Sequence, residues 1–136
     1  MKKIFPKPFI FSLILFVPLV MSTTVFCEET YVFVLKWGEL GSGDGQFQYP
    51  GGIDLDINGI VYVTDLFNHR IQKFDSKGNF LAKWGSYGSG DGQFKYPQGI
   101  AIDFIGNVCV ADHGNHRVQK FDTDGHFLVK WGSFGS

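Results

Sequence analysis

The sequence has almost no cysteine: only Cys27 and Cys109 occur among its 136 residues. This count excludes a framework of disulfides and a zinc site built from cysteines. Helical periodicity is also missing, because no apolar i, i+3, i+4 pattern runs for two turns after residue 27, so no helix is expected there. Cys109 lies in an apolar run and is interpreted as a small buried hydrophobic residue.

An excess of basic charge is lacking as well. The chain has 12 lysines and arginines against 13 aspartates and glutamates, and three of the lysines lie in the first seven residues. Removal of that leader would leave 9 basic against 13 acidic residues, a net charge of about −4. Binding to a phosphate backbone needs clustered Lys and Arg. No nucleic-acid partner is therefore expected.

Long hydrophobic runs are confined to residues 1–27, which have the layout of a secretory signal peptide. A basic head is followed by the uncharged apolar run Phe9–Val20. Cleavage is expected between Thr23 and Glu28, which would make the protein secreted or cell-surface. Counted as far as Phe26, the apolar run reaches about 18 residues, the lower edge of a membrane span. An uncleaved N-terminal anchor is the alternative, and only in that case is the membrane a partner.

After the leader, the chain repeats itself with a period of 47 residues. Residues 37–83 and 84–130 are identical at about 29 of 47 positions, and a third copy begins at Trp131. A fixed period of this length is typical of solenoids, propellers and arrays, in which one unit cannot bury its hydrophobic face without a neighbour. The repeat therefore predicts an architecture more directly than it predicts a function.

Each copy predicts four short strands, because apolar residues alternate between turn signals. The expected strands are Ile53–Ile57, Ile60–Thr64, Ile71–Phe74 and Phe80–Trp84 in the first copy, and Ile100–Phe104, Val108–Ala111, Val118–Phe121 and Phe127–Trp131 in the second.

The segments between the strands carry turn signals. Asn58-Gly59 favours a type I′ hairpin turn. Pro50 is expected to stop pairing just before the first strand. The glycine-rich connectors 41–47 and 88–94 are expected to be flexible. Strands with a long return loop form a propeller blade, and a solenoid of parallel strands is the minor alternative.

The segments Tyr96–Asp103 and Val110–Asp122, together with Val63–Asp65 and Asn68–Asp75 in the first copy, resemble the NHL repeat. The resemblance covers residues 31–136 and implies a six-bladed propeller with four-stranded antiparallel blades. The expected fold is all-β, with about two and a quarter NHL-type blades and hence an incomplete propeller. The expected segments are the leader 1–27 and a propeller fragment 28–136, with an outer strand at 31–38 and repeats at 39–85 and 86–132. The residues taken as the repeat signature are Trp37, Asp65, Asn68, His69, Arg70, Trp84, Asp112, Asn115, His116, Arg117 and Trp131.

Six blades of this length would need about 280 residues. The chain is therefore expected to be either a truncated piece of a longer gene product or a subunit that closes a ring by self-association, for example as a trimer. Two blades alone should leave apolar residues such as Val61, Val63, Val108 and Val110 uncovered, and an isolated monomer should not be well behaved.

Candidate chemistry is sparse. The run from Asp54 to Asp65 matches most of a calcium-loop pattern, but it ends in Asp, lacks flanking helices and is lost in the second copy. His113 could join a metal site, yet Leu66 occupies its place in the first copy. Recurring Asp, Asn and Arg residues are expected to satisfy turn backbone groups and to pair with one another. No catalytic residue, metal or cofactor is assigned, and the protein is not expected to be an enzyme.

Two function classes are compatible with these features. The first is a non-catalytic exported module that binds a protein or a glycan. The alternative is part of a lyase- or hydrolase-type propeller of the kind that the resemblance implies, with His, Asp and Glu converging on an axial metal from several blades. Family members that bind RNA or act as ubiquitin ligases add basic surfaces or a zinc RING, and this sequence has neither.

Overall fold

The computed structural model describes residues 33–133 and 135, so the expected leader and its cleavage site lie outside the described residues. The described part is nearly all-β, and its two four-stranded antiparallel sheets remain open at their edges. This confirms the expected fold class of incomplete propeller blades. One three-residue 3₁₀ helix, η1 (His113–Asn115), interrupts the second repeat, and it is too short to leave a periodic signal. No helix within the described ranges is long and apolar enough to span a membrane.

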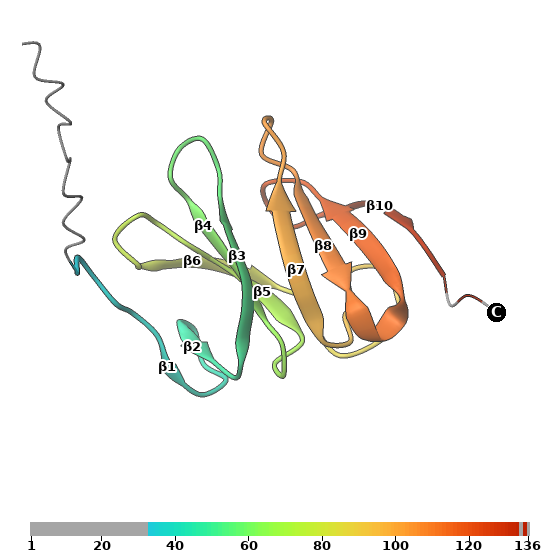
Figure 1. Cartoon of the computed structure of the whole chain (residues 1–136), viewed down its shortest axis with the longest axis horizontal. Coiled ribbons are helices and arrows are strands. Elements are labelled where there is room, and N and C mark those ends of the chain that lie inside the picture. The colour runs from blue at the N-terminus through green and yellow to red at the C-terminus, as the bar shows by residue number, and fades with distance from the viewer. Residues whose placement is uncertain (1–32, 134, 136) are drawn as a thin grey trace, which may run out of the picture. The chain divides into compact units, whose positions relative to one another are not determined.

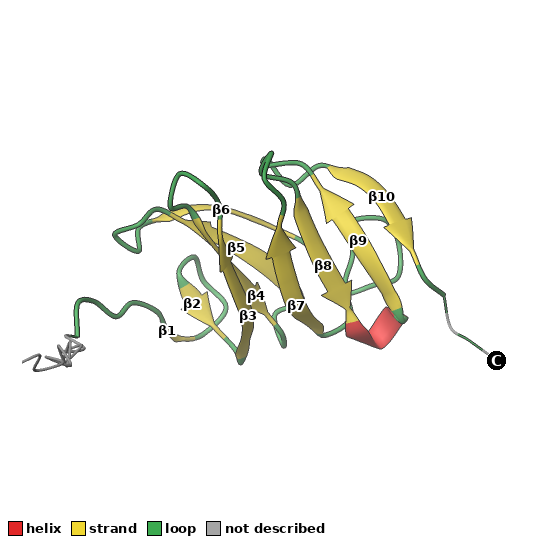
Figure 2. Ribbon diagram, turned by 45° about the horizontal axis from the view of Figure 1, so that its top comes forward, coloured by secondary structure: helices red, strands yellow, loops and turns green. Residues whose placement is uncertain are grey.

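The two sheets are the two blades, one for each copy of the repeat (Figure 1). Blade 1 has the order β3 (Pro50–Leu55), β4 (Val61–Asp65), β5 (Arg70–Phe74) and β6 (Phe80–Trp84). Blade 2 repeats this order with β7 (Pro97–Ile102), β8 (Val108–Asp112), β9 (Arg117–Phe121) and β10 (Phe127–Trp131). Strand β7 of blade 2 lies beside β3 of blade 1 (Figure 2). Two-residue strands β1 (Glu39–Leu40), just before the first connector, and β2 (Gln46–Phe47), at its end, pair in parallel.

The first strand of each blade differs from the prediction. Strands β3 and β7 begin at the proline, and Pro50 stands opposite Asp65 before a bulge shifts the register. Proline is tolerated as the first residue of a strand because it need not donate there. Residues 33–38 form no strand. The remaining two residues of the expected outer strand at 31–38 lie outside the described part of the chain.

The β3–β4 turn is also not the type I′ hairpin that Asn58-Gly59 suggested, because only Gly59 has a positive φ, of 77°. Instead, the Gly59 N–H donates to the Asp56 carbonyl and the Asp56 carboxylate accepts the N–H groups of Asn58 and Ile60. The same carboxylate-centred turn recurs at Asp75, Asp103 and Asp122, each followed by glycine at the third place. Asp56 therefore belongs to a turn and not to a strand.

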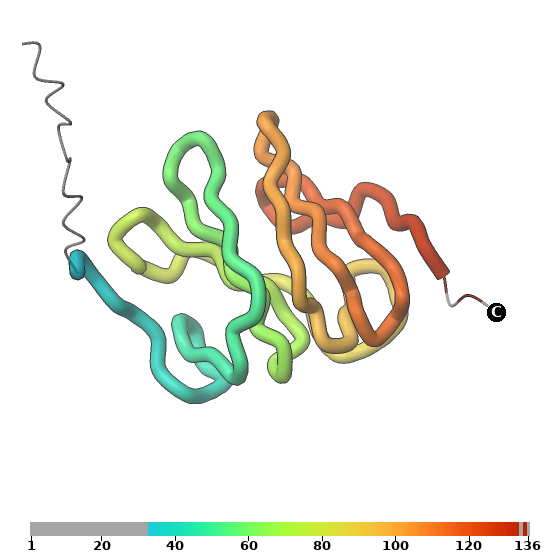
Figure 3. The backbone as a smooth tube through the Cα atoms, viewed as in Figure 1, coloured from blue at the N-terminus to red at the C-terminus, as the bar shows by residue number. Residues whose placement is uncertain are grey.

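The main core lies between the two blades. Tyr62 and Ile71 on the facing side of blade 1 pack against Val108, Val110 and Phe121 of blade 2. These side chains are fully buried, and burying each is worth about 1.5–3 kcal/mol. The tube in Figure 3 shows how closely β3 and β7 run beside each other.

Polar contacts tie the edges of the two blades together. The Thr64 hydroxyl donates to the Gln98 carbonyl over 2.8 Å, and the Asp54 carboxylate accepts the Ile102 N–H over 2.8 Å. Gly52 lies so close to blade 2 that a Cβ there would be 2.5 Å from the Gln98 carbonyl oxygen. Only glycine allows the two backbones to approach this closely.

The expectation that four valines would be uncovered is wrong. Val61 and Val63 pack with Phe74, Phe47 and Phe80, because the first connector folds over that face of blade 1. Val108 and Val110 lie in the core between the blades. The uncovered residues on the open face of blade 1 are instead Ile53 and Leu55, which are 60% and 56% exposed.

Candidate functional site

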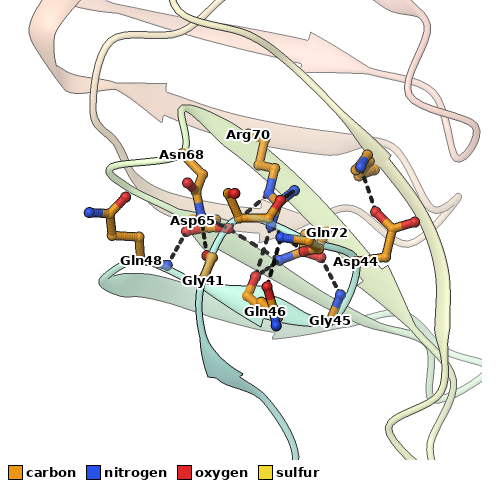
Figure 4. A network of polar contacts seen from close by, with 12 residues as sticks. Gly41, Asp44, Gly45, Gln46, Gln48, Asp65, Asn68, Arg70 and Gln72 are labelled. Atoms are coloured by element: carbon orange, nitrogen blue, oxygen red, sulfur yellow. Dashed lines mark hydrogen bonds and ion pairs between the residues drawn. The ribbon is translucent and has the colours of Figure 1, made fainter.

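The acidic residue of the repeat signature forms the centre of a buried polar network at the end of β4 (Figure 4). One oxygen of the Asp65 carboxylate accepts the Gln48 N–H over 2.8 Å. The other oxygen accepts from Asn68 and Arg70 over 2.8 Å and from Gln72 over 3.2 Å. The side chain of Asp65 is fully buried, and the guanidinium of Arg70 beside it supplies the compensating charge that a buried carboxylate requires.

The same network holds the glycine-rich connector in place. Arg70 donates to the carbonyls of Ser42, Gly43 and Gln46 over 2.7–2.8 Å, and Asn68 donates to the Gly41 carbonyl over 2.9 Å. The connector is therefore fixed by side-chain hydrogen bonds, contrary to the expectation of flexibility.

The second repeat reproduces this network around Asp112. Asn115, Arg117 and Gln119 donate to its carboxylate over 2.8–3.1 Å. Arg117 and Asn115 also donate to carbonyls of the connector 88–93. The structure thus brings the recurring Asp, Asn and Arg of each repeat together, where they join a connector to its blade.

The remaining signature residues lie around these networks. His69 and His116 occupy the left-handed region, with φ of 53° and 54°. Trp37 packs on Phe74 with a centroid distance of 6.2 Å. Trp84 packs on Tyr62 and Phe121, and Trp131 of the last strand is half exposed.

His69 also links the two blades. Its Nδ1 accepts the Tyr96 N–H over 3.2 Å, which requires that this nitrogen carry no proton. Burial lowers the pKa of His69 and so favours the neutral ring that can accept this bond.

An exposed row of aromatic rings crosses from blade 1 to blade 2, at the end of the sheets where β4 turns into β5 and β7 begins. Neighbouring ring centroids in this row are 4.9–5.9 Å apart. Tyr49 and Tyr87 at the two ends are 69% and 62% exposed. We call this row the aromatic strip; in spatial order it consists of Tyr49, Phe67, Tyr96, His69 and Tyr87.

Two members of the aromatic strip depart from the repeat. The place of Phe67 is taken by Gly114 in the second copy, and the place of Tyr87 is taken by Leu40 in the first. The blade fold therefore does not require an aromatic residue at either position. Without these two rings, the recurring Tyr49, Tyr96 and His69 would not form a continuous row. The sequence analysis did not predict the strip. The signal that could have indicated it is that Phe67 and Tyr87 are aromatic at positions where the other copy of the repeat is not.

Asp54 and His113, the first residues of the two candidate metal sites, lie on β3 and on η1. Asp54 caps backbone N–H groups of Leu55 and Ile102, and His113 opens the short helix η1. Among the described residues, no group of three or more His, Cys, Asp and Glu side chains is placed to hold a metal ion.

Comparison with known proteins shows which repeat the two copies resemble. The NHL repeat model matches residues 47–74 and 94–121, one segment for each blade. Among curated proteins, Caenorhabditis elegans B-box type zinc finger protein ncl-1 is 40% identical over 53 residues and C. elegans protein lin-41 is 48% identical over 48. These matches cover 39% and 35% of the chain but only 6% and 4% of the relatives. One segment in each blade is therefore similar to the NHL repeat.

Solved structures show the same fold at lower identity. A candidate exported protein of Bacteroides fragilis has a TM-score of 0.59 at 23% identity, over 76% of this chain and 30% of that one. A luciferin-regenerating enzyme has a TM-score of 0.52 at 19% identity, over 65% of this chain and 31% of that one. This likeness concerns the fold alone, because the identities of 23% and 19% are low.

Proposed function

We propose that this protein is an exported NHL-repeat module that binds a partner, without catalysis, through the aromatic strip. The observation that carries the proposal is the strip itself: large rings are exposed where the repeat does not demand them. Tyrosine supplies contact area at a low cost in conformational entropy and is enriched at binding surfaces. Exposed aromatic groups that the fold does not use point to recognition.

The non-catalytic part of the proposal rests on how the polar residues are used. Asp65, Asp112, Arg70 and Arg117 are engaged in holding connectors. The alternative, a lyase- or hydrolase-type propeller, would need non-recurring His or carboxylate groups that converge on one point. His113 is the non-recurring histidine of the second signature, and within the described residues no such cluster surrounds it.

The proposal that the protein is exported rests on the leader, residues 1–27. Export predicts that the mature chain is shorter than the full sequence. Protein recovered outside the cytoplasm of an exporting host should begin between Thr23 and Glu28, because the signal peptide is removed there. Intact mass spectrometry measures this directly. Retention of residues 1–27 in a soluble cytoplasmic form would refute the export proposal and leave the binding proposal to be judged separately.

Binding through the strip is tested by exchanging its non-recurring residues. The purified protein should be applied to arrays of peptides and of glycans, alongside the double variant Phe67→Ala/Tyr87→Leu. The double variant should lose the ligands of the unmodified protein, because it removes two exposed rings and leaves the buried core between the blades intact. Tyr87→Leu installs the residue that the first repeat already has at this place.

The matched control is Phe104→Ile, which replaces a 90% exposed ring in the β7–β8 turn by the residue of the first repeat. It should keep every ligand, because it lies at the other end of β7 from the strip. Ligands retained by the double variant, or lost in the control, would argue against the strip as the binding surface.

A further inference from the structure

We infer that residues 33–37 occupy, within a single chain, the place that strand β10 of a second copy takes when two copies dock, so that docking requires this segment to withdraw. The inference is independent of the ligand proposed for the aromatic strip. It starts from three copies of one five-residue motif, Phe-x-x-Lys-Trp, which follow one another at the repeat period. The copies are Phe33–Trp37, β6 (Phe80–Trp84) and β10 (Phe127–Trp131).

The middle copy of the motif, β6, shows what a complete junction between two blades contains. Its backbone pairs with β5 of blade 1, where Trp84 stands opposite Ile71. Its tryptophan reaches blade 2: the ring centroids of Trp84 and Phe121 are 6.0 Å apart at an interplanar angle of 52°. A Cβ on Gly125 would lie 2.7 Å from Cδ2 of Trp84. One motif therefore belongs to the first blade and places its tryptophan on the second.

The first copy of the motif makes only the second of these two contacts. Trp37 lies on blade 1 as Trp84 lies on blade 2, with its ring centroid 6.2 Å from that of Phe74 at an angle of 53°. A Cβ on Gly78 would lie 2.8 Å from Cδ2 of Trp37. Residues 33–38 form no strand, however. The segment therefore has the position of an outer strand without a blade of its own.

The last copy of the motif makes only the first contact. Strand β10 pairs with β9 of blade 2, and its Trp131 stands opposite Val118. The Trp131 side chain is 48% exposed. Figure 1 shows β10 and residues 33–38 at opposite ends of the pair of blades. The two outer motifs are therefore complementary halves of one junction, which forms when blade 2 of one copy meets blade 1 of another.

The open face of blade 1 has room for the blade that would bring β10 with it. A groove of about 250 Å³ opens beside Trp37; its lining residues are Lys36, Trp37, Phe47, Pro50, Ile53 and Val63. On the corresponding face of blade 2, Tyr62 and Ile71 of blade 1 fill this place and form the core between the blades. Cys109 and Val118 stand at these two positions of the second repeat. In a second copy they would enter the groove.

Only one motif fits each junction, because Trp37 and the second copy's Trp131 both need the place against Phe74 and Gly78. Strand β10 is the motif that is held more firmly. It pairs with β9 at four register positions, and the Asp122 carboxylate closes the turn before it by accepting two backbone N–H groups. Lys130 also forms an exposed ion pair with Asp91. We therefore expect β10 to keep its place and residues 33–37 to withdraw.

Oxidation of the tryptophans in the unmodified protein tests this exchange. Hydroxyl-radical oxidation should be measured residue by residue with mass spectrometry, over the concentration range in which the mass of the protein rises. Oxidation of Trp131 should fall as the copies dock, and oxidation of Trp37 should rise. Trp84 is the internal control and should stay constant, because its junction lies within one chain and is present in both states.

The same substitution in the two outer motifs should have opposite effects on docking. Trp37→Ala should lower the concentration of half-association by about tenfold, because a site that its own chain occupies binds a partner in proportion to the fraction of open chains. Trp131→Ala should raise that concentration by about tenfold or more, as loss of a tryptophan anchor does. Ile53→Asp added to Trp37→Ala should return the protein towards the monomer, which separates docking on blade 1 from non-specific aggregation. Thermal unfolding checks that each variant is folded.

The contrary outcomes are distinct. Protection of Trp37 with release of Trp131 would mean that β10 withdraws, and the assignment of the two roles would be wrong. Protection of both tryptophans, or a change of association in the same direction in both variants, would show that the motifs do not compete. A protein that stays monomeric at every concentration would exclude a second copy as the occupant. None of these results bears on the ligands of the aromatic strip, which the variants of Phe67 and Tyr87 test separately.

Discussion

Asp65→Ala should lower the free energy of unfolding by about 3–5 kcal/mol, the usual effect of removing one partner of a buried ion pair. The change leaves the guanidinium of Arg70 in a buried place without its carboxylate. It also removes the acceptor of Gln48, Asn68 and Gln72. A net stability of about 5–15 kcal/mol is typical of a domain, so this single change should be close to the limit of folding. Urea unfolding at constant protein concentration measures it.

Two further variants make the result specific. Asp112→Ala should cost a similar amount, because its four contacts have lengths within 0.1 Å of those around Asp65. Asp44→Ala removes the partner of Lys83 in an exposed ion pair and should cost less than about 1 kcal/mol. Equal effects of Asp65→Ala and Asp44→Ala would mean that the buried network does not hold the blade.

The purified protein should also self-associate, with a mass that rises with concentration towards that of a three-chain ring of six blades. The physical reason is that each blade is built to be covered on both faces. In a pair of blades only the faces between them are fully covered, and the first connector covers just part of the open face of blade 1. Association of a terminal face of blade 2 with the first face of another copy is a heterologous contact, and such contacts close into rings when the rotation permits. Light scattering over a range of concentrations measures the mass.

Equivalent positions of the two repeats differ in burial, depending on whether they face the other blade or lie on an open face. Ile71 is fully buried between the blades, whereas its counterpart Val118 on the open face of blade 2 is only half-buried. Ile100 is half-buried against blade 1, whereas its counterpart Ile53 is exposed. Full burial of an apolar side chain stabilises the fold by about 1.5–3 kcal/mol, and a partly exposed side chain supplies only part of this free energy. Neighbouring blades, from further copies or from additional repeats, would bury these side chains fully.

The blade architecture could be predicted from the sequence because its signals are periodic. The 47-residue repeat and the alternation of apolar residues placed the second, third and fourth strands of each blade within one residue at either end. The recurrence of Asp, Asn and Arg also indicated a structural role, since a residue that every blade needs must return with the period. In the structure these residues carry the contacts between connector and blade.

Other features depend on contacts that no local pattern encodes. Strand β3 begins at Pro50 because the chain pairs there with the end of β4, across a bulge that alternation does not reveal. Val61 and Val63 are buried because Phe47 of the connector returns over them. The aromatic strip joins residues 49, 67, 69, 87 and 96 through the contact of two blades, so its continuity appears only in three dimensions.

The most direct test of the central claim, that these two blades are an incomplete propeller, is sedimentation velocity of the purified protein and two matched variants. Ile53→Asp places a charge on the open face of blade 1, and Ile57→Asp places the same charge in the nearby turn, where the side chain is 91% exposed. The unmodified protein and Ile57→Asp should sediment as concentration-dependent assemblies, and Ile53→Asp should shift towards the monomer. A compact monomer that unfolds cooperatively and sediments identically in all three forms at every concentration would contradict the account.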